Sequence, residues 1–269
     1  MCDLPRLKYG KYPRMNNSNE YDERKAFFDS LLTIYGRKPV LEALQDREIK
    51  PFRLHLAESN KQAGIIQELQ QLAERQGAEV LYHSRDALSR ISKNKKQDQG
   101  VVLDIAAPSY RHISSLQVST QRELIAVENI TNPQNLGMII RSVGASPMAG
   151  VIIPKKGCAP LDALVIKASA GAIFKTAIYY CDDLLQEMPT LKQLGYEFLG
   201  LAGQGKTPLN RLTNRSPSIF LLGNETVGLS ESMINACDDL VHIPMQNGVE
   251  SLNVSIAASL VAFRSMYRE

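Results

Sequence analysis

The residues best suited to chemistry lie near the end of the chain, where polar side chains gather at the expected start of a helix. Residues 251–255 read Ser-Leu-Asn-Val-Ser and follow a short polar loop that comes after Ile243 and Met245. Hydroxyl groups, an amide and the unpaired N–H groups of a first helical turn would converge there, which favours the binding of a ligand. The pattern also fits an ordinary helix cap, because Ile256 and Leu260 recur at helical spacing and predict a buried helix.

Two upstream segments also place polar residues beside apolar runs. Residues 132–137 read Asn-Pro-Gln-Asn-Leu-Gly and precede Arg141, while residues 221–225 read Leu-Leu-Gly-Asn-Glu and precede Gly228. The planar guanidinium of Arg141 suits a phosphate or a developing negative charge. Gly223 would let the backbone approach a ligand closely. Taken separately, Arg141 fits a residue in a surface salt bridge, and the second segment fits an ordinary strand-to-helix turn.

Together, and in this order, the three segments resemble the signature motifs of the SpoU (TrmH) family of RNA ribose 2′-O-methyltransferases, within the SPOUT superfamily. The resemblance covers roughly residues 31–269 and implies transfer of a methyl group from S-adenosylmethionine to a ribose hydroxyl of RNA. Such a reaction needs a bound methyl donor, a 2′-oxygen held in line with it, and a group that accepts or offsets the hydroxyl proton. Holding the methyl donor and the 2′-oxygen in position should therefore supply much of the rate enhancement.

The motif positions define a set of candidate site residues. The candidate catalytic residues are Asn135, Arg141, Glu225, Ser251 and Asn253. The candidate cofactor-binding residues are Leu222, Gly223, Asn224, Gly228, Ile243, Met245, Ser251 and Leu252. Asn135 and Arg141 are six positions apart and need not share a helix face, so Asn135 could lie in the helix or in the loop before it. Residues 246–248 depart slightly from the family pattern, which leaves their contacts open.

A sheet must position these segments. Residues 122–269 contain short apolar runs separated by helical segments, which predicts a largely parallel, doubly wound α/β sheet with both faces covered. The expected strands are 124–127, 151–153, 178–180, 198–201, 219–222 and 240–243. The family resemblance adds the SPOUT fold with a deep trefoil knot, an exception to the rule that chains do not thread loops.

The first part of the chain predicts a smaller α/β domain over residues 31–107. Its expected elements are a helix through Val40 and Leu44, a helix over 62–76, and strands at 52–56, 80–82 and 101–106. Residues 34–44 and 99–102 resemble the substrate-binding domain of the family branch that methylates guanosine in 23S rRNA, a domain with a ribosomal L30e-type RNA-binding fold. Residues 108–121 are expected to be a linker, and residues 1–30 a basic, flexible tail. A basic run at Lys93, Lys95 and Lys96 fits a solvated loop or an RNA contact.

Composition limits the partners, metal sites and cellular location that can be expected. A net charge of +3 permits a polyanionic partner without requiring one. The four cysteines are scattered and the histidines form no metal-binding spacing, so neither disulfides nor a metal site is expected. Because no apolar run reaches the ~20 residues of a membrane span and no signal peptide is visible, we expect a cytoplasmic protein that does not bind membranes.

The resemblance also implies partners. We expect RNA, and ribosomal RNA rather than tRNA, because family members with a bare catalytic domain often act on tRNA. We also expect a homodimer, since family catalytic domains pair and the terminal helix over 254–267 has apolar residues around more than one face.

Residues 200–207 offer a competing interpretation. They read Gly-Leu-Ala-Gly-Gln-Gly-Lys-Thr, satisfy the Walker A pattern and follow an apolar strand, so a P-loop NTPase is the alternative. A phosphate-binding loop must lead into a stable helix, but Pro208 follows at once and no later strand ends in a suitable Asp. We therefore expect a Gly-rich strand exit. A non-catalytic RNA-binding protein is a further alternative, disfavoured by the joint presence of the polar motif residues.

Overall fold

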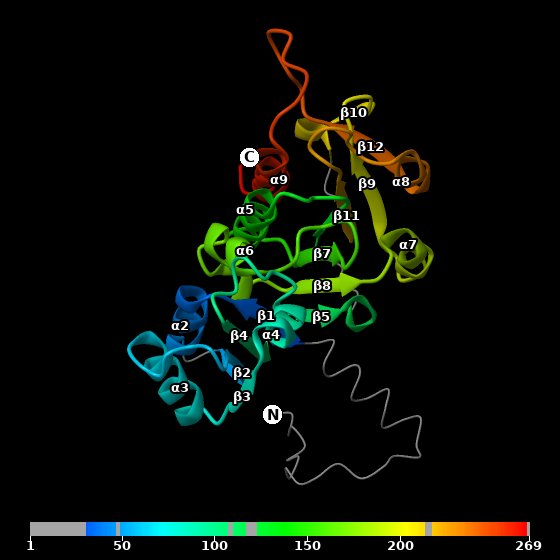
Figure 1. Cartoon of the computed structure of the whole chain (residues 1–269). Coiled ribbons are helices and arrows are strands. Elements are labelled where there is room, and N and C mark those ends of the chain that lie inside the picture. The colour runs from blue at the N-terminus through cyan, green and yellow to red at the C-terminus, as the bar shows by residue number, and fades with distance from the viewer. Residues whose placement is uncertain (1–30, 47–48, 107–109, 117–122, 213–216, 268–269) are drawn as a thin grey trace.

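The computed structural model describes residues 31–46, 49–106, 110–116, 123–212 and 217–267 (Figure 1). The predicted basic tail, residues 1–30, lies outside this part of the chain. The described residues form two sheets, a smaller one followed by a larger one.

The smaller sheet has the strand order β1-β4-β2-β3. Its strands are β1 (Leu31–Tyr35), β2 (Lys50–Ala57), β3 (Glu79–His83) and β4 (Val101–Ala106). Strands β2 and β3 are parallel, whereas β4 runs antiparallel to β1 and β2. Helices α2 (Arg37–Gln45) and α3 (Ile65–Arg75) contribute to one hydrophobic cluster, while Leu88 of α4 (Arg85–Ser92) packs in another against the opposite face. The expected α/β arrangement is confirmed, and β1 and α4 are additions to it.

The larger sheet is parallel throughout, as expected, with the order β10-β12-β9-β11-β6-β7-β8-β5. The strands are β5 (Tyr110–His112), β6 (Leu124–Val127), β7 (Gly150–Pro154), β8 (Ile178–Cys181), β9 (Glu197–Leu201), β10 (Thr207–Pro208), β11 (Ser218–Leu222) and β12 (Asp239–His242). Every strand predicted from an apolar run in this region is present. The buried runs are nearly continuous because both faces of a parallel sheet are covered.

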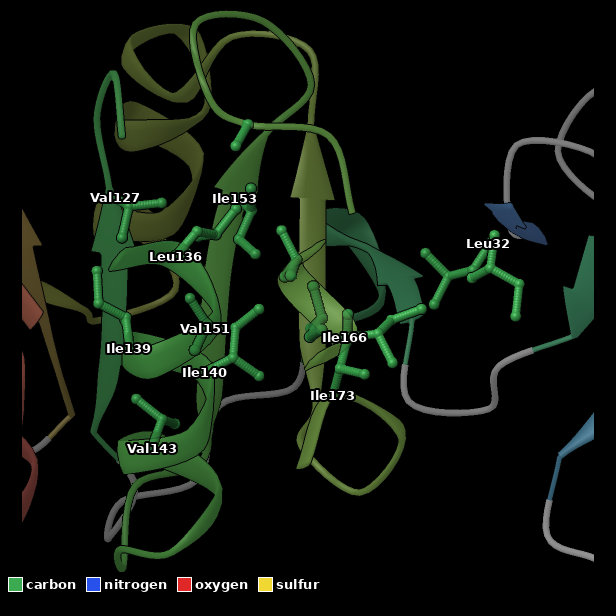
Figure 2. Packing of buried hydrophobic residues seen from close by; sticks show 14 of the residues in the cluster. Leu32, Val127, Leu136, Ile139, Ile140, Val143, Val151, Ile153, Ile166 and Ile173 are labelled. Atoms are coloured by element: carbon green, nitrogen blue, oxygen red, sulfur yellow. The ribbon is translucent and has the colours of Figure 1, made fainter. Parts of the chain in front are cut away.

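Helices cover both faces of this sheet (Figure 1). One side carries α5 (Pro133–Gly144), α6 (Ala163–Ala168) and α9 (Val254–Phe263), and the other carries α7 (Leu184–Gln193) and α8 (Glu231–Ala236). Figure 2 shows α5 directing Leu136, Ile139, Ile140 and Val143 at the strands behind it. The deep trefoil knot stays a prediction from the family resemblance.

Helix α5 begins where the sequence provides a cap. The Asn132 side chain accepts hydrogen bonds from the backbone N–H groups of Gln134 and Asn135, and Pro133 takes the first helical position. Both features favour a helix start, because the cap satisfies N–H groups that have no partner within the helix and proline has no N–H to satisfy. Asn135 therefore lies within the first turn of the helix and not in the preceding loop.

The two sheets share buried contacts. Leu32 of β1 belongs to the same hydrophobic cluster as Ile166 of α6, toward which Figure 2 shows it pointing. The Tyr35 hydroxyl donates a 2.5 Å hydrogen bond to Oδ2 of Asp162, the residue that caps α6. We call the smaller sheet with its helices the smaller module, and the larger sheet with its helices the larger module. The smaller module is therefore packed directly on the helix layer of the larger module.

In this region one sequence expectation is wrong in part, and the rejection of a P-loop agrees with the structure. The range predicted as a linker, 108–121, contains β5, which pairs in parallel with β8 at the edge of the larger sheet. The Walker-like segment ends in the short strand β10 at Thr207–Pro208, followed by a 3-10 turn at Leu209–Arg211, so no α-helix follows its Lys-Thr end. None of the described helices is long and apolar enough to span a bilayer.

Candidate active site

A cavity of about 420 Å³ lies where β9, β11 and β12 end and α9 begins. In a parallel sheet the carboxyl ends of neighbouring strands meet at one edge, which is the usual place for a ligand in such folds. The cavity wall contains all of the candidate cofactor-binding residues, namely Leu222, Gly223, Asn224, Gly228, Ile243, Met245, Ser251 and Leu252. The second and third sequence segments, which α8 and β12 separate in the chain, are thus brought together.

The loop after β11 forms one wall of the cavity and is held by its own backbone. Asn224 and Gly228 exchange two backbone hydrogen bonds of 3.0 and 2.9 Å, and Gly228 has a φ of +73° that favours glycine. A Cβ on Gly223 would collide with the backbone of Gly228 and Leu229. Gly223 is therefore needed for contact between two backbone segments of the loop, and its role in close approach to a ligand stays a prediction.

Two residues that follow β6 form hydrogen bonds with the loop after β11 and with the start of α8. Glu128 accepts hydrogen bonds from the backbone N–H of Ser230 at 2.9 Å and from its hydroxyl at 2.7 Å, and Ser230 is the N-cap of α8. The Asn129 carbonyl accepts a 2.9 Å hydrogen bond from the Asn224 side chain. Glu128 and Asn129 thus fix the position of the wall.

Three candidate catalytic residues form a directed hydrogen-bond chain. Asn253 donates from Nδ2 to Oδ1 of Asn135 at 3.1 Å, and Asn135 donates from Nδ2 to Oε1 of Glu225 at 2.6 Å. Ser255 begins the chain by donating from its backbone N–H and hydroxyl to Oδ1 of Asn253. Each amide has one orientation that satisfies both neighbours, so the chain fixes the Glu225 carboxylate at the edge of the cavity.

The other two candidate catalytic residues are placed differently. Ser251 is exposed and lines the cavity beside Leu252. Arg141 is exposed on α5, where Met138 one turn earlier is also exposed, and it does not line the cavity. Within one chain, the structure does not bring Arg141 to the other motif residues.

Helix α5 is held close to α6 by small residues. A Cβ on Gly137 would lie 2.5 Å from the Ala168 Cβ and 2.7 Å from the Val165 carbonyl oxygen. Ala168 and Ser169, at the end of α6, thus form part of the surface on which α5 packs. The packing sets the position of Asn135 and Arg141 through the helix that carries them.

Several cavity residues were missed by sequence reasoning. Residues 201–204 line the cavity, as do His242 and Glu250. The signal for residues 201–204 is the glycine-rich exit from an apolar strand, a pattern that by itself predicts only a structural turn. Nδ1 of His242 is buried and has no hydrogen-bond partner within the described chain. The described residues include no cluster of His, Cys, Asp and Glu placed to hold a metal ion.

Comparison with known proteins identifies the family. The model of the SpoU rRNA Methylase family matches residues 123–263, and the model described as RNA 2′-O ribose methyltransferase substrate binding matches residues 33–111. An uncharacterized tRNA/rRNA methyltransferase of Mycolicibacterium smegmatis is 33% identical over 243 residues, which cover 88% of this chain and 76% of the relative.

Solved structures share the fold. The AdoMet-bound rRNA methyltransferase from Sinorhizobium meliloti has a TM-score of 0.63 and 20% identity, over 92% of both chains. The SpoU methyltransferase AviRb from Streptomyces viridochromogenes has a TM-score of 0.62 and 21% identity, over 93% of this chain and 91% of AviRb. With both family models in their expected order and the second and third motif segments together at one edge of the sheet, this chain belongs to the SpoU rRNA Methylase family of RNA methyltransferases.

Proposed function

We propose that this protein methylates the 2′-hydroxyl of a ribose in ribosomal RNA and uses S-adenosylmethionine as the methyl donor. The observation that carries the proposal is the chain Asn253–Asn135–Glu225, which joins all three sequence motifs beside the cavity. The residues of this hydrogen-bond chain lie up to 118 positions apart in the sequence. Their convergence therefore depends on the fold and not on local sequence.

The cavity suits the cofactor. Leu222, Ile243, Met245 and Leu252 provide apolar walls for an adenosine group, while Ser251 and the loop backbone provide polar partners. When bound, S-adenosylmethionine supplies a methyl group activated by its positively charged sulfur.

The protein's own residues would then hold the ribose and balance charge. The Asn135–Glu225 bond fixes a carboxylate that can accept a hydrogen bond from the substrate, and Ser251 lies beside it in the wall. Arg141 would bind a phosphate or stabilise the forming alkoxide, because a guanidinium is too weak a base to remove the proton near neutral pH.

We further propose that two copies of the chain associate through the faces of α9 and α5. Ile256 and Leu260 of α9 are 49% and 44% exposed, and Met138 of α5 is 43% exposed. A groove of about 610 Å³ beside them is largely apolar and includes Phe263 and Tyr267. An exposed apolar surface of this kind is typical of a subunit interface. Light scattering at micromolar concentration should report a dimer, and a fully active monomer would contradict it.

Ribosomal RNA is favoured as substrate by the smaller module. Its family match is to a substrate-binding domain, and the structural neighbour from Sinorhizobium meliloti, which covers both modules, is described as an rRNA methyltransferase. We assign residues 31–107 to RNA binding and residues 122–269 to catalysis. A tRNA substrate is the alternative, because the sequence relative is named for both RNAs.

Mapping 2′-O-methyl groups in total RNA from a deletion strain and its parent would test this function. One methylated position in rRNA should be lost on deletion and restored by the purified protein with S-adenosylmethionine. Loss of a tRNA methyl group would select the alternative substrate. Calorimetry with S-adenosylhomocysteine and with ATP separates a methyltransferase from an NTPase, and binding of ATP alone would overturn the proposal.

A further inference from the structure

A second cleft, of about 430 Å³, lies between the two modules. The smaller module contributes Tyr35, Lys93 and Asn94, and the larger module contributes Tyr110, Lys155 and Asp162. The cleft is distinct from the cofactor cavity, with which it shares no lining residue.

The polar lining of this cleft favours an anion. Lys93 and Lys155 are its basic residues, and Asp162 is its acidic residue. Asp162 is buried, and both carboxylate oxygens have donors: Oδ1 accepts from two backbone N–H groups of α6, and Oδ2 accepts from the Tyr35 hydroxyl. The negative charge of Asp162 is thus offset within the protein, while Lys93 and Lys155 add two positive charges to the lining.

The two lysines are presented from opposite walls. Lys93 is exposed and ends α4 in a left-handed conformation with a φ of 53°. Its neighbour in the basic run, Lys95, instead forms a 2.8 Å ion pair with Asp86 and does not line the cleft. Of the basic run, the structure therefore places Lys93 in the cleft and pairs Lys95 outside it.

Lys155 lies among aromatic rings. Its Nζ is 4.6 Å from the centroid of the Tyr180 ring, and the Tyr110 ring stacks on Tyr180 with centroids 4.7 Å apart. The Nζ also lies 3.5 Å from Oδ1 of Asp182, whose side chain is 80% exposed. The Lys155 side chain is 32% exposed, so solvent screens this ion pair and a phosphate can replace Asp182.

Lys155 of the cleft and the cofactor cavity lie at the same edge of the larger sheet, where its strands end. Lys155 follows β7, which is parallel to β6, and β6 is parallel to β11, the strand that leads into the cavity wall. Gly157 packs so closely on Asn129 that a Cβ there would collide with its side chain, and Asn129 in turn holds Asn224 of the wall. A chain of nucleotides could therefore pass from one site to the other.

We propose that this cleft binds the backbone of a single-stranded RNA segment next to the methylated nucleotide, with Lys93 and Lys155 each contacting a phosphate. The proposal rests on the proposed function and adds the path of the substrate. The cleft has room for a nucleotide-sized segment but not for a duplex, and proteins read RNA sequence mainly in single-stranded regions.

The test measures how binding of a fluorescein-labelled single-stranded RNA of about 20 nucleotides depends on salt in the full-length protein. Each phosphate contact contributes about 0.7 to the slope of log affinity against log salt for a single strand. Lys93→Gln and Lys155→Gln should each weaken binding several-fold and lower the slope by about 0.7, and the double variant by about twice that amount. Lys95→Gln is the matched control, since it removes the same charge from a residue outside the cleft, and it should leave the slope unchanged.

Equal slopes for the cleft variants and the Lys95→Gln control would overturn the proposal, as would failure of the wild-type protein to bind this RNA. The same loss of slope on a duplex of that RNA would overturn the single-strand assignment. Calorimetry with S-adenosylhomocysteine separates this inference from the proposed function. If the cofactor binds normally and the slopes of the cleft variants are unchanged, only the cleft proposal is wrong. If the cofactor does not bind and the slopes change as expected, only the proposed methyltransferase function is wrong.

Discussion

Asn135 of α5 donates a 2.6 Å hydrogen bond to the Glu225 carboxylate, which lies 90 positions away in the cavity wall. Asn135 is 8% exposed, so water cannot readily replace this contact. The bond connects the helix that carries Arg141 to the loop that borders the cofactor cavity. Any change in the packing of α5 should therefore reach the active site through it.

Replacing Asn135 by Ala should reduce methyl transfer by about 10–100-fold, because a hydrogen bond to a charged group contributes roughly 1.5–3 kcal/mol. Binding of S-adenosylhomocysteine should change little, since Asn135 does not line the cavity. Asn253→Ser keeps a residue type that caps α9 well but removes the contact to Asn135. The double variant should lose little more than Asn135→Ala alone, as expected within one network. Additive losses in single-turnover rates would show that the two amides act independently.

Removal of the Tyr35 hydroxyl tests the contact between the modules. Burial, together with Asp162, raises the pKa of Tyr35 above its usual range, so the hydroxyl stays a donor at all ordinary pH values. Tyr35→Phe leaves Asp162 without one of its donors and should lower the free energy of unfolding by about 1–3 kcal/mol. Tyr82→Phe is the control, because Tyr82 is 44% exposed and water can take over its contacts. Urea denaturation that gives equal values for both variants would contradict this account.

The sequence revealed the central strands of the larger sheet because each is a short, buried apolar run. It did not reveal β5, whose residues Tyr-Arg-His pair with β8 alone at the edge of the sheet and need no apolar pattern. The motif residues could be named, but their contacts could not. The Asn253–Asn135 bond requires α9 to pack on α5, and no local pattern encodes that long-range contact.

The α5–α6 contact predicts a cost for enlarging Gly137. Gly137→Ala would place its Cβ 2.5 Å from that of Ala168 and 2.7 Å from a carbonyl oxygen, so the helices must separate. We expect a loss of about 1–3 kcal/mol in the free energy of unfolding, together with reduced methyl transfer. Gly203→Ala is a stability control, since nothing lies within 4 Å of the added Cβ. Thermal and urea unfolding should show wild-type stability for that control, and a fully stable, active Gly137→Ala would refute close packing here.

The thiols of Cys181, which is buried, and Cys237, which is partly buried, should be unreactive in the folded protein. Burial raises the pKa of Cys181 to about 12 and that of Cys237 to about 11, from an ordinary value of 9.0. Both thiols should therefore resist iodoacetamide near pH 8 until the protein is unfolded. Because the folded pKa values are the higher ones, their contribution to stability is complete below pH 9.0 and is lost as the pH rises toward 12. Mass spectrometry of the labelled peptides gives the extent of labelling at each cysteine. Rapid labelling of either thiol in the native state would contradict this prediction.

Arg141 provides the sharpest test of mechanism. It is exposed on α5 and lies outside the cofactor cavity, which fits a residue that contacts RNA and not the cofactor. Arg141→Lys keeps the positive charge but loses the planar pair of donors. If those donors position a phosphate or stabilise the forming alkoxide, turnover should fall by roughly 10²–10³ while S-adenosylhomocysteine binds as in the wild type. Single-turnover rates of both proteins across pH decide the role. If the wild-type rate rises with pH through an ionisation that the variant lacks, Arg141 is the base and the electrostatic role is wrong.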